Sequence, residues 1–272
     1  MKRKSILSLV LTGALAVSLI GCGGSSSSSS DDKTIRIGVS PVPHKEIVEQ
    51  AVEELEGKGY TVEIVEFDDY VLPNTSVEEG DLDANYFQHI AYLNTFNEEK
   101  GTHLTYTAEI HLEPMGVFSN KYKSVEEIED GATVAVPDDS SNETRALRVL
   151  EAAGLIEVAE GDVLKVTDIT ANPKNLQFSE LTAASLPRVL EEVDIAVING
   201  NYALEAGLDV NENAFYAEDK DKDSLKERRN VLAVKEGTEN TQKIKDLTEA
   251  LTSDKVRDFI NEKYKGAVVP VF

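Results

Sequence analysis

The segment PDDSSNETRAL (residues 137–147) contains an arginine, Arg145, with the chemistry needed to hold a carboxylate. It follows an apolar stretch, Thr133–Val136, that has the pattern of a strand. Two serines and Asn142 are typical of a helix N-cap, so the segment predicts a turn from this strand into a helix. Backbone N–H groups at a helix start, together with an arginine, suit a bound anion such as a carboxylate.

Arg145 has a second interpretation, because a cation in the first turns of a helix opposes the helix macrodipole and needs a partner. An acidic side chain of the same segment could supply that partner in a structural ion pair, with no ligand involved. The three candidates are Asp138, Asp139 and Glu143.

Aromatic side chains are concentrated in two nearby segments, FDDYVLPN (residues 67–74) and NYFQHIAYL (residues 85–93), although aromatics make up only 6% of the chain. One explanation is a core patch, since aromatic rings are commonly buried for packing. The other is an aromatic pocket, which suits a thioether because sulfur packs well against ring edges. The rings concerned are Tyr70, Tyr86, Phe87, His89 and Tyr92.

A third polar segment, VINGNYALEAGL (residues 197–208), begins at the end of a predicted strand, where Asn199 and Asn201 flank Gly200. In open α/β sheets the ligand crevice lies beyond the carboxyl ends of the strands, so both amides are placed to contact a ligand. Simple turn chemistry is the alternative, because asparagine and glycine are ordinary turn residues.

The chain lacks the spacing motifs of the common metal sites and enzymes. No HExxH, GxSxG or GxxxxGK[ST] motif occurs, and the only cysteine lies near the N-terminus. Acidic residues are so frequent that no carboxylate pair stands out. We therefore predict a protein that is not an enzyme and that uses no metal and no cofactor. The histidines are scattered along the sequence: His44, His89, His103 and His111.

Residues 1–21 have the pattern of a bacterial lipoprotein signal peptide. Three basic residues precede an apolar stretch that is too short to span a membrane comfortably, since a spanning helix needs about 20 apolar residues. Leu-Ile-Gly-Cys then resembles the lipobox, in which Cys22 is acylated; an ordinary signal peptide with an incidental cysteine is the alternative. The Gly/Ser run within residues 22–33 predicts a flexible tether. We expect a protein anchored by lipid to the cell membrane, on its extracytoplasmic side.

The net charge of the chain limits the classes of partner that it can bind. The chain has 50 acidic and 27 basic residues, a net charge of −23, and removal of the signal peptide makes the charge more negative. Such a body repels nucleic acid and anionic lipid headgroups, so we predict no nucleic-acid partner and membrane contact only through the lipid anchor.

Strand-like and helix-like periodicities alternate along the rest of the chain, which predicts an α/β protein. The predicted strands are Thr34–Val39, Thr61–Phe67, Ala84–Phe87, Thr105–His111, Thr133–Val136 and Ile195–Ile198. The predicted helices are Lys45–Glu56, His89–Asn97, Ser124–Glu129, Asn142–Ala153, Thr182–Glu191, Thr241–Thr252 and Asp254–Tyr264. Ser124 with Glu127 resembles a capping box. The charged segment Asp209–Arg229 is interpreted as a surface excursion.

Several segments, taken in order, resemble the methionine-binding lipoproteins of the MetQ/NlpA type. The resemblance covers about 35–208 and resumes at NVLAV (residues 230–234). The segments are IGVSPVPHKEI (37–47), FDDYVLPN, LDANYFQHIAYL (82–93), HLEPMG (111–116), NPKNLQF (172–178) and VINGNYALEAGL. The resemblance implies a periplasmic-binding-protein fold of type II, with a ligand cleft between two α/β lobes. One lobe would comprise 34–117 and about 230–272, and the other 118–229.

The resemblance also implies roles for individual residues. Arg145 would pair with the ligand carboxylate, with Asn142 beside it, and Asn199 and Asn230 would bind the amino or carboxylate end. His111 and Glu113 are weaker candidates, because a strand leading out of the first lobe could hold them for structural reasons. The side chain of methionine would be lined by Tyr70, Phe87, His89 and Tyr92.

The implied function is that of a substrate-binding lipoprotein of an ABC importer. It would capture methionine, in the L form, and deliver it to a membrane permease whose ATPase lies in the cytoplasm. One alternative is a binder of a methionine-containing dipeptide or a methionine derivative. Another is a surface lipoprotein that acts as an adhesin or scaffold and transports nothing.

Overall fold

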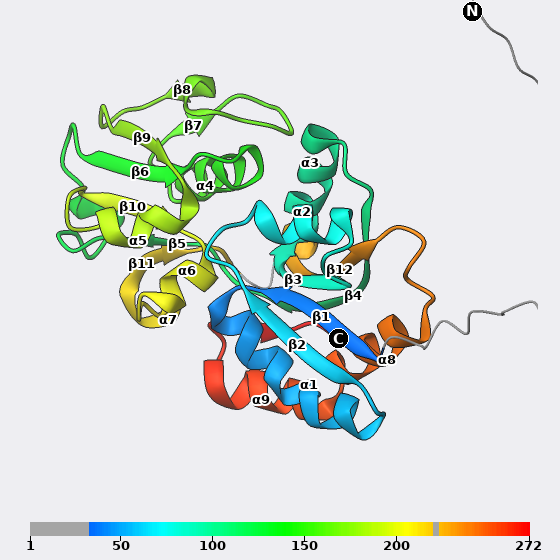
Figure 1. Ribbon diagram of the computed structural model, residues 1–272. Helices are drawn as coiled ribbons and strands as arrows, with labels where there is room; N and C mark the ends of the chain where they lie inside the picture. The colour runs from blue at the N-terminus through cyan, green and yellow to red at the C-terminus, as the bar shows by residue number, and fades with distance from the viewer. Residues whose placement is uncertain (1–32, 220–222) are drawn as a thin grey trace, which may run out of the picture. The chain divides into compact units, whose positions relative to one another are not determined.

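Two large sheets and the helices that cover them organise the computed structural model, which describes residues 33–219 and 223–272 (Figure 1). The predicted signal peptide, Cys22 and the tether up to residue 32 lie outside the described residues. Among the helices of the described part, none has the length and apolarity needed to cross a membrane.

The first sheet has the strand order β13-β4-β12-β3-β1-β2. Its strands are β1 (Thr34–Val39), β2 (Thr61–Glu66), β3 (Ala84–His89), β4 (Leu104–Leu112), β12 (Arg229–Lys235) and β13 (Val269–Pro270). β1 pairs in parallel with β2 and β3, whereas β12 pairs antiparallel with β3 and β4. Two segments from the C-terminal part of the chain therefore complete a sheet that the N-terminal part begins.

Helices cover both faces of the first sheet. Successive side chains of a strand point to opposite faces, so each face carries apolar residues that a layer of helices buries. In β12, Leu232 and Val234 join one buried apolar cluster, and Val231 and Ala233 join another. The first cluster includes side chains of α1 (Glu46–Gly57), α8 (Gln242–Leu251) and α9 (Asp254–Tyr264), which lie on one side of the sheet in Figure 1. The second includes side chains of α2 (Leu72–Glu79) and α3 (Ile90–Lys100).

The second sheet has the order β11-β5-β10-β6-β9. Its strands are β5 (Gly116–Phe118), β6 (Thr133–Pro137), β9 (Gln177–Leu181), β10 (Ile195–Ile198) and β11 (Ala214–Ala217). Ile195 and Val197 of β10 pack on the face covered by α4 (Ser140–Ala152). Ala196 and Ile198 pack on the opposite face, against α5 (Leu186–Val189), α6 (Gly200–Glu205) and α7 (Val210–Asn213).

The remaining elements are short. β7 (Glu157–Val158) and β8 (Ile169–Ala171) form a separate two-stranded ribbon. A π-type turn precedes α1 at η1 (Pro41–Lys45). The 3-10 turns are η2 (Val125–Glu127), η3 (Val166–Asp168), η4 (Ala183–Ser185) and η5 (Asp223–Arg228).

The six predicted strands are confirmed, with ends that shift by at most two residues. Two predicted helices are wrong in part. Ser124–Glu129 is only the turn η2, and Ser124 makes no side-chain cap; Glu127 instead accepts from the backbone N–H of Lys123 at 2.7 Å. In Thr182–Glu191, Pro187 cannot supply a helical N–H, and the segment divides into η4 and α5.

The interpretation of Asp209–Arg229 as a surface excursion is also wrong in part. Its apolar residues Ala214–Ala217 form β11, which pairs antiparallel with β5 across a bulge. α7 precedes the strand, and η5 lies after it. The strand is short and charged residues flank it, so the sequence shows no strand-like alternation of apolar residues there.

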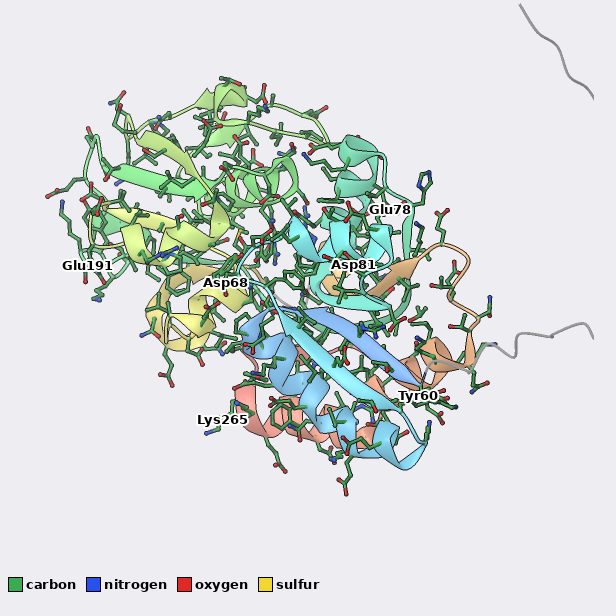
Figure 2. All side chains as sticks on the ribbon, in the orientation of Figure 1. Tyr60, Asp68, Glu78, Asp81, Glu191 and Lys265 are labelled. Carbon is green, nitrogen blue, oxygen red and sulfur yellow. The ribbon has the colours of Figure 1, made fainter. Side chains whose placement is uncertain are left out.

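The chain passes from the first sheet to the second between Leu112 and Gly116, and it reaches the first sheet again at Arg229. Contacts between the two halves also form outside these connections. Figure 2 shows Asp68 where the segment after β2 approaches α6, and the Asp68 carbonyl accepts a hydrogen bond from Tyr202 Oη at 3.2 Å.

Candidate ligand-binding pocket

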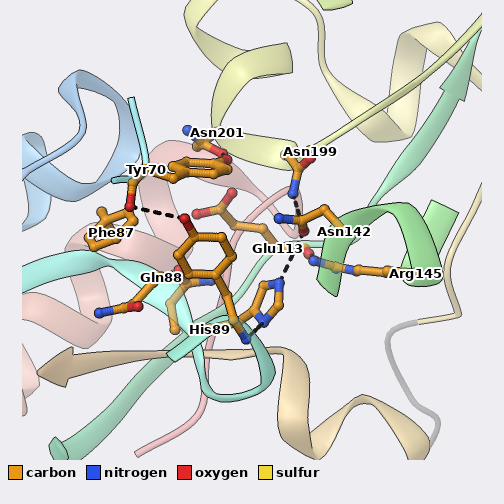
Figure 3. Close-up of a pocket in the computed structure, with 12 residues that line it drawn as sticks. Tyr70, Phe87, Gln88, His89, Glu113, Asn142, Arg145, Asn199 and Asn201 are labelled. Atoms are coloured by element: carbon orange, nitrogen blue, oxygen red, sulfur yellow. Dashed lines mark hydrogen bonds between the residues drawn. The ribbon is translucent and has the colours of Figure 1, made fainter. Parts of the chain in front are cut away.

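Residues from both halves of the described chain surround one cavity. Figure 3 shows Tyr70 and Asn201 on one side of it and Asn142, Asn199 and Arg145 on another, with Glu113 between them. All eight predicted site residues line this cavity, namely Tyr70, Phe87, His89, Tyr92, Asn142, Arg145, Asn199 and Asn230. Four further residues complete the lining: Gln88, Glu113, Gly200 and Asn201. Of these, the sequence gave Glu113 as a weaker candidate and placed Asn201 in the polar segment after β10, whereas Gln88 was not singled out.

The ends of strands place most of these side chains. Phe87 and His89 belong to the last residues of β3, and Asn199 follows β10 directly. Glu113 follows β4, and Arg145 lies on α4, the helix that follows β6. The carboxyl ends of these strands therefore meet at the cavity, as expected for a ligand crevice in an α/β protein.

One wall of the cavity is aromatic. The ring of Tyr70 lies 5.6 Å from that of Phe87 and 5.6 Å from that of Tyr92, measured between centroids. On its other side, Tyr70 packs at 4.9 Å against Tyr202 of α6. Tyr86, which the sequence grouped with these rings, is fully buried in the cluster formed with α1, α8 and α9 and does not line the cavity.

His89 connects this wall to α4. Its Nδ1 accepts from the backbone N–H of Tyr92 at 3.1 Å, which leaves the proton on Nε2 to be donated to Asn142 Oδ1, also at 3.1 Å. Burial, with Arg145 and Arg228 nearby, holds the pKa of His89 well below its ordinary value, so the ring is neutral. Asn142 Oδ1 accepts a second bond from Asn199 Nδ2 at 2.8 Å, and the three side chains form one chain of hydrogen bonds.

Two buried polar atoms of the cavity lining have no hydrogen-bond partner among the described residues. They are the acceptor Asn199 Oδ1 and the donor Asn201 Nδ2. An unpaired buried polar group costs about 1–3 kcal/mol, so such groups in a cavity indicate that another molecule supplies the missing partners. One acceptor and one donor suit a ligand that carries both an N–H donor and an oxygen acceptor.

Arg145 is only 4% exposed and pairs with Glu218, whose side chain is 9% exposed. Arg145 Nε donates to Glu218 Oε1 at 2.9 Å and Nη2 donates to Glu218 Oε2 at 2.5 Å. Nη2 also donates to the backbone carbonyl of Glu113 at 2.8 Å. Burial by itself lowers the pKa of Arg145, but the Glu218 carboxylate outweighs it and raises that pKa.

The structural ion pair considered from the sequence thus exists, but its three proposed partners are wrong. Asp139 is instead the N-cap of α4 and accepts from the backbone N–H of Asn142 at 2.9 Å, where a serine or Asn142 was expected to cap. Glu143 accepts from the backbone N–H of Val166 at 2.9 Å. Glu218 is a residue that sequence reasoning missed, because it follows the unrecognised strand β11.

Glu113 extends from the cavity into a buried cluster behind it. Its Oε1 lies 2.6 Å from His111 Nε2 and 3.5 Å from His44 Nε2. His111 Nδ1 is bonded to the hydroxyl of Tyr86, and His44 Nε2 lies 3.2 Å from Asn230 Oδ1. Burial lowers the pKa of His44 to about 4 and that of His111 to about 3, so both rings are neutral at pH 7.

Burial raises the pKa of Glu113, while the nearby His44 and Arg145 act in the opposite direction. The ligand atoms of His44, His111 and Glu113 lie within 4.8 Å of one another, so these residues could hold a metal ion. The sequence spacing gave no sign of this grouping. A metal would have to replace the hydrogen bond that already joins His111 to Glu113.

Gly200 allows α6 to approach Glu113 closely. A Cβ at this position would lie 2.7 Å from the Glu113 Cβ and 2.9 Å from its Oε2. Both distances are shorter than van der Waals contact, so a side chain here would displace the carboxylate from the cavity.

The chain matches the model of the NlpA lipoprotein family over residues 35–272. It is 36% identical to the methionine-binding lipoprotein MetQ of Bacillus subtilis, covering 97% of this chain and 96% of the relative. A nutrient-binding protein from Burkholderia cenocepacia, solved with methionine bound, is 39% identical with a TM-score of 0.82, covering 88% of this chain and all of that one. The periplasmic substrate-binding protein of an ABC transporter from Coxiella burnetii is 36% identical with a TM-score of 0.82, covering 87% and 100%.

The fold of this chain is therefore the two-lobed α/β fold of these substrate-binding proteins. The predicted resemblance is confirmed over almost the whole described part of the chain. This protein belongs to the NlpA lipoprotein family.

Proposed function

We propose that this protein is the substrate-binding lipoprotein of an ABC importer and that it binds L-methionine in the cavity between its lobes. The observation that carries the proposal is the division of one small cavity into an aromatic wall and a polar end with unpaired buried atoms. A free amino acid with an apolar side chain has the matching division. The methionine-bound relative and the methionine-binding name of another support the choice of side chain.

The thioether would lie against Tyr70, Phe87 and Tyr92, because sulfur interacts favourably with ring edges.

The backbone end of the amino acid would meet the polar side of the cavity. Its carboxylate would accept from Arg145 Nη1 and Asn201 Nδ2, and its ammonium would donate to Asn199 Oδ1 and Glu113. Asn142 has a different part in this arrangement. Its amide already bonds His89, Asn199 and Asp139, so it would hold its neighbours in place.

We also propose that the two lobes follow the two sheets, close to the predicted limits of 34–117 with 230–272 and 118–229. Methionine would bind to an open form and be enclosed by hinge motion at the two connections between the sheets. Exclusion of water strengthens the pairing of its charges with the pocket. The closed form would then dock on the permease. No bond of the substrate changes in this cycle, so the protein would act without catalysis.

The test is calorimetric titration of residues 23–272 after unfolding and refolding, which removes any ligand retained through purification. L-Methionine, D-methionine, glycyl-L-methionine and L-leucine are compared. Tight one-to-one binding of L-methionine with much weaker binding of leucine is expected. Preferred binding of the dipeptide would change the proposed ligand from methionine to a dipeptide and leave the proposed transport role in place. Absence of heat with all four compounds would remove the proposal and favour a role without a small ligand.

A further inference from the structure

Glu218 is a nearly buried acid that makes direct contact with Arg145, the residue proposed to hold the ligand carboxylate. Its two carboxylate oxygens are both used by Arg145, at 2.9 and 2.5 Å. Oε2 also accepts from the backbone N–H of Met115 at 2.8 Å. The backbone N–H of Glu218 donates to the Met115 carbonyl at 3.1 Å, so the carboxylate is fixed at both ends.

The donors of Arg145 can be counted. A guanidinium has five N–H groups in a rigid plane. Glu218 takes one from Nε and one from Nη2, and the Glu113 carbonyl takes the other from Nη2. The two N–H groups of Nη1 are the ones that these bonds leave for a ligand. The two hydrogen bonds to Glu218 therefore determine which edge of the guanidinium is left to face the cavity.

Charge gives the pair a second consequence. Arg145 and Glu218 are both almost wholly buried, and together they are electrically neutral. An arginine without this partner would attract any small anion strongly, because charges interact strongly where water is excluded. With Glu218 in place, a carboxylate gains less from charge alone, and a ligand that also carries an ammonium group gains an advantage.

We propose that Glu218 is a positioning and specificity residue, which orients Arg145 toward the ligand carboxylate and makes the pocket select zwitterionic amino acids over simple anions. This inference rests on the proposed function, since it takes Arg145 as the carboxylate receptor. Glu218 acts through Arg145 and does not itself touch the ligand.

The test compares three probes of nearly equal shape by calorimetry with refolded protein. L-Methionine is a zwitterion, 4-(methylthio)butanoate lacks the ammonium group and is an anion, and L-methioninamide lacks the carboxylate and is a cation. Glu218→Gln removes the charge while keeping one acceptor oxygen. The affinity of the anion relative to L-methionine should rise by about tenfold or more, and that of the cation should fall, because one buried negative charge has been removed.

Glu218→Asp separates orientation from charge. It keeps the charge but shortens the side chain, so all three affinities should fall while their ratios stay near those of the wild type. Glu212→Gln is the matched control, since Glu212 is an exposed acid of the same chain segment, and it should change nothing.

Equal loss of affinity for all three probes in Glu218→Gln, as in Glu218→Asp, would overturn the selectivity and leave Glu218 a structural residue. Unchanged affinities in both variants would overturn the whole proposal. These outcomes are separate from failure of the proposed function, in which the wild-type protein itself would not bind L-methionine.

Discussion

Tyr70 and Asn201 are 131 positions apart in the chain, and the hydroxyl of Tyr70 donates to Asn201 Oδ1 at 2.5 Å. Tyr70 precedes α2 on the first sheet, and Asn201 lies in α6 on the second. The same tyrosine ring forms the middle of the aromatic wall. A single side chain thus contributes both to the pocket and to the contact between the two halves.

Tyr70→Phe should weaken methionine binding without changing the aromatic wall. The variant loses one bond between the halves, and a hydrogen bond of this kind contributes about 0.5–1.5 kcal/mol, so Kd should rise by about twofold to tenfold. Calorimetry measures this change, and Tyr106→Phe, at a half-exposed tyrosine of β4, is the control. An unchanged Kd in Tyr70→Phe would mean that the bond does not help to hold the ligand-bound form.

Gly200→Ala should damage the pocket more than the size of a methyl group suggests. The new Cβ would meet Glu113 at 2.7 Å, and overpacking of this kind costs about 1–3 kcal/mol. Because the carboxylate is pushed out of place, methionine affinity should fall as well as stability. Gly57→Ala is the matched control: a Cβ at Gly57 meets nothing within 4 Å, so stability and affinity should stay near those of the wild type. Normal binding by Gly200→Ala would show that Glu113 has no part in the pocket.

Sequence reasoning located the pocket residues because each of them belongs to a local pattern. Arg145 follows a strand by way of a turn, Asn199 ends a strand, and the aromatic residues are close together in sequence. Such short segments show which side chains lie at a strand end. The resemblance to a family then indicated that these separate segments contribute to one site, which no local sequence pattern could show.

The sequence did not predict the ion pairs and hydrogen bonds between residues that are far apart along the chain. Glu218 is 73 positions from Arg145, and the ion pair depends on β11, four residues long and surrounded by charges. His44 is far in sequence from His111 and Glu113. It meets them because Asn230 of β12 pairs with His111 of β4 and lies within hydrogen-bond distance of His44. Asp139 is much closer to Arg145 in sequence than Glu218 is, yet it caps the backbone of α4 instead of pairing with the arginine.

Stability should fall with acid because of the buried histidines. The pKa of His111 is about 3 in the folded protein and about 6.5 in the unfolded chain. Between these values the unfolded chain binds the proton and the folded protein does not. The contribution of His111 to the free energy of unfolding is therefore complete above about pH 6.5 and is lost as the pH falls. The raised pKa of Glu113 acts in the opposite direction, and it is present in both proteins compared below.

His111→Gln removes this contribution while keeping one donor and one acceptor for Glu113 and Tyr86. Between pH 7 and pH 5, the wild type should lose about 2 kcal/mol more free energy of unfolding than the variant. Urea unfolding at the two pH values measures the difference. His103→Gln, at an exposed histidine, is the control and should follow the wild type. An equal loss in wild type and His111→Gln would show that another group causes the acid sensitivity.

Cys22→Ser should release the protein from membranes, because acylation requires the thiol. The full chain is expressed in bacteria, and the membrane fraction after a salt wash is compared with the soluble fraction. Ser25→Ala should remain with the membranes. Methionine affinity of the released protein should equal that of the anchored form, since the described residues that line the pocket all lie between Tyr70 and Asn230. Membrane association of Cys22→Ser would indicate that the signal peptide is retained or that another anchor exists.

Arg145→Ala should lose both binding and stability, and a second variant separates the two losses. Removal of the arginine leaves the Glu218 carboxylate buried and unpaired, which costs about 3–5 kcal/mol. Replacing both residues by methionine removes both charges, and such exchanges of a buried ion pair for apolar groups are often neutral for stability. The double variant should therefore unfold near the urea midpoint of the wild type and still show no heat with methionine. Methionine binding by that folded double variant would show that Arg145 is a structural residue and that the carboxylate is held elsewhere in the pocket.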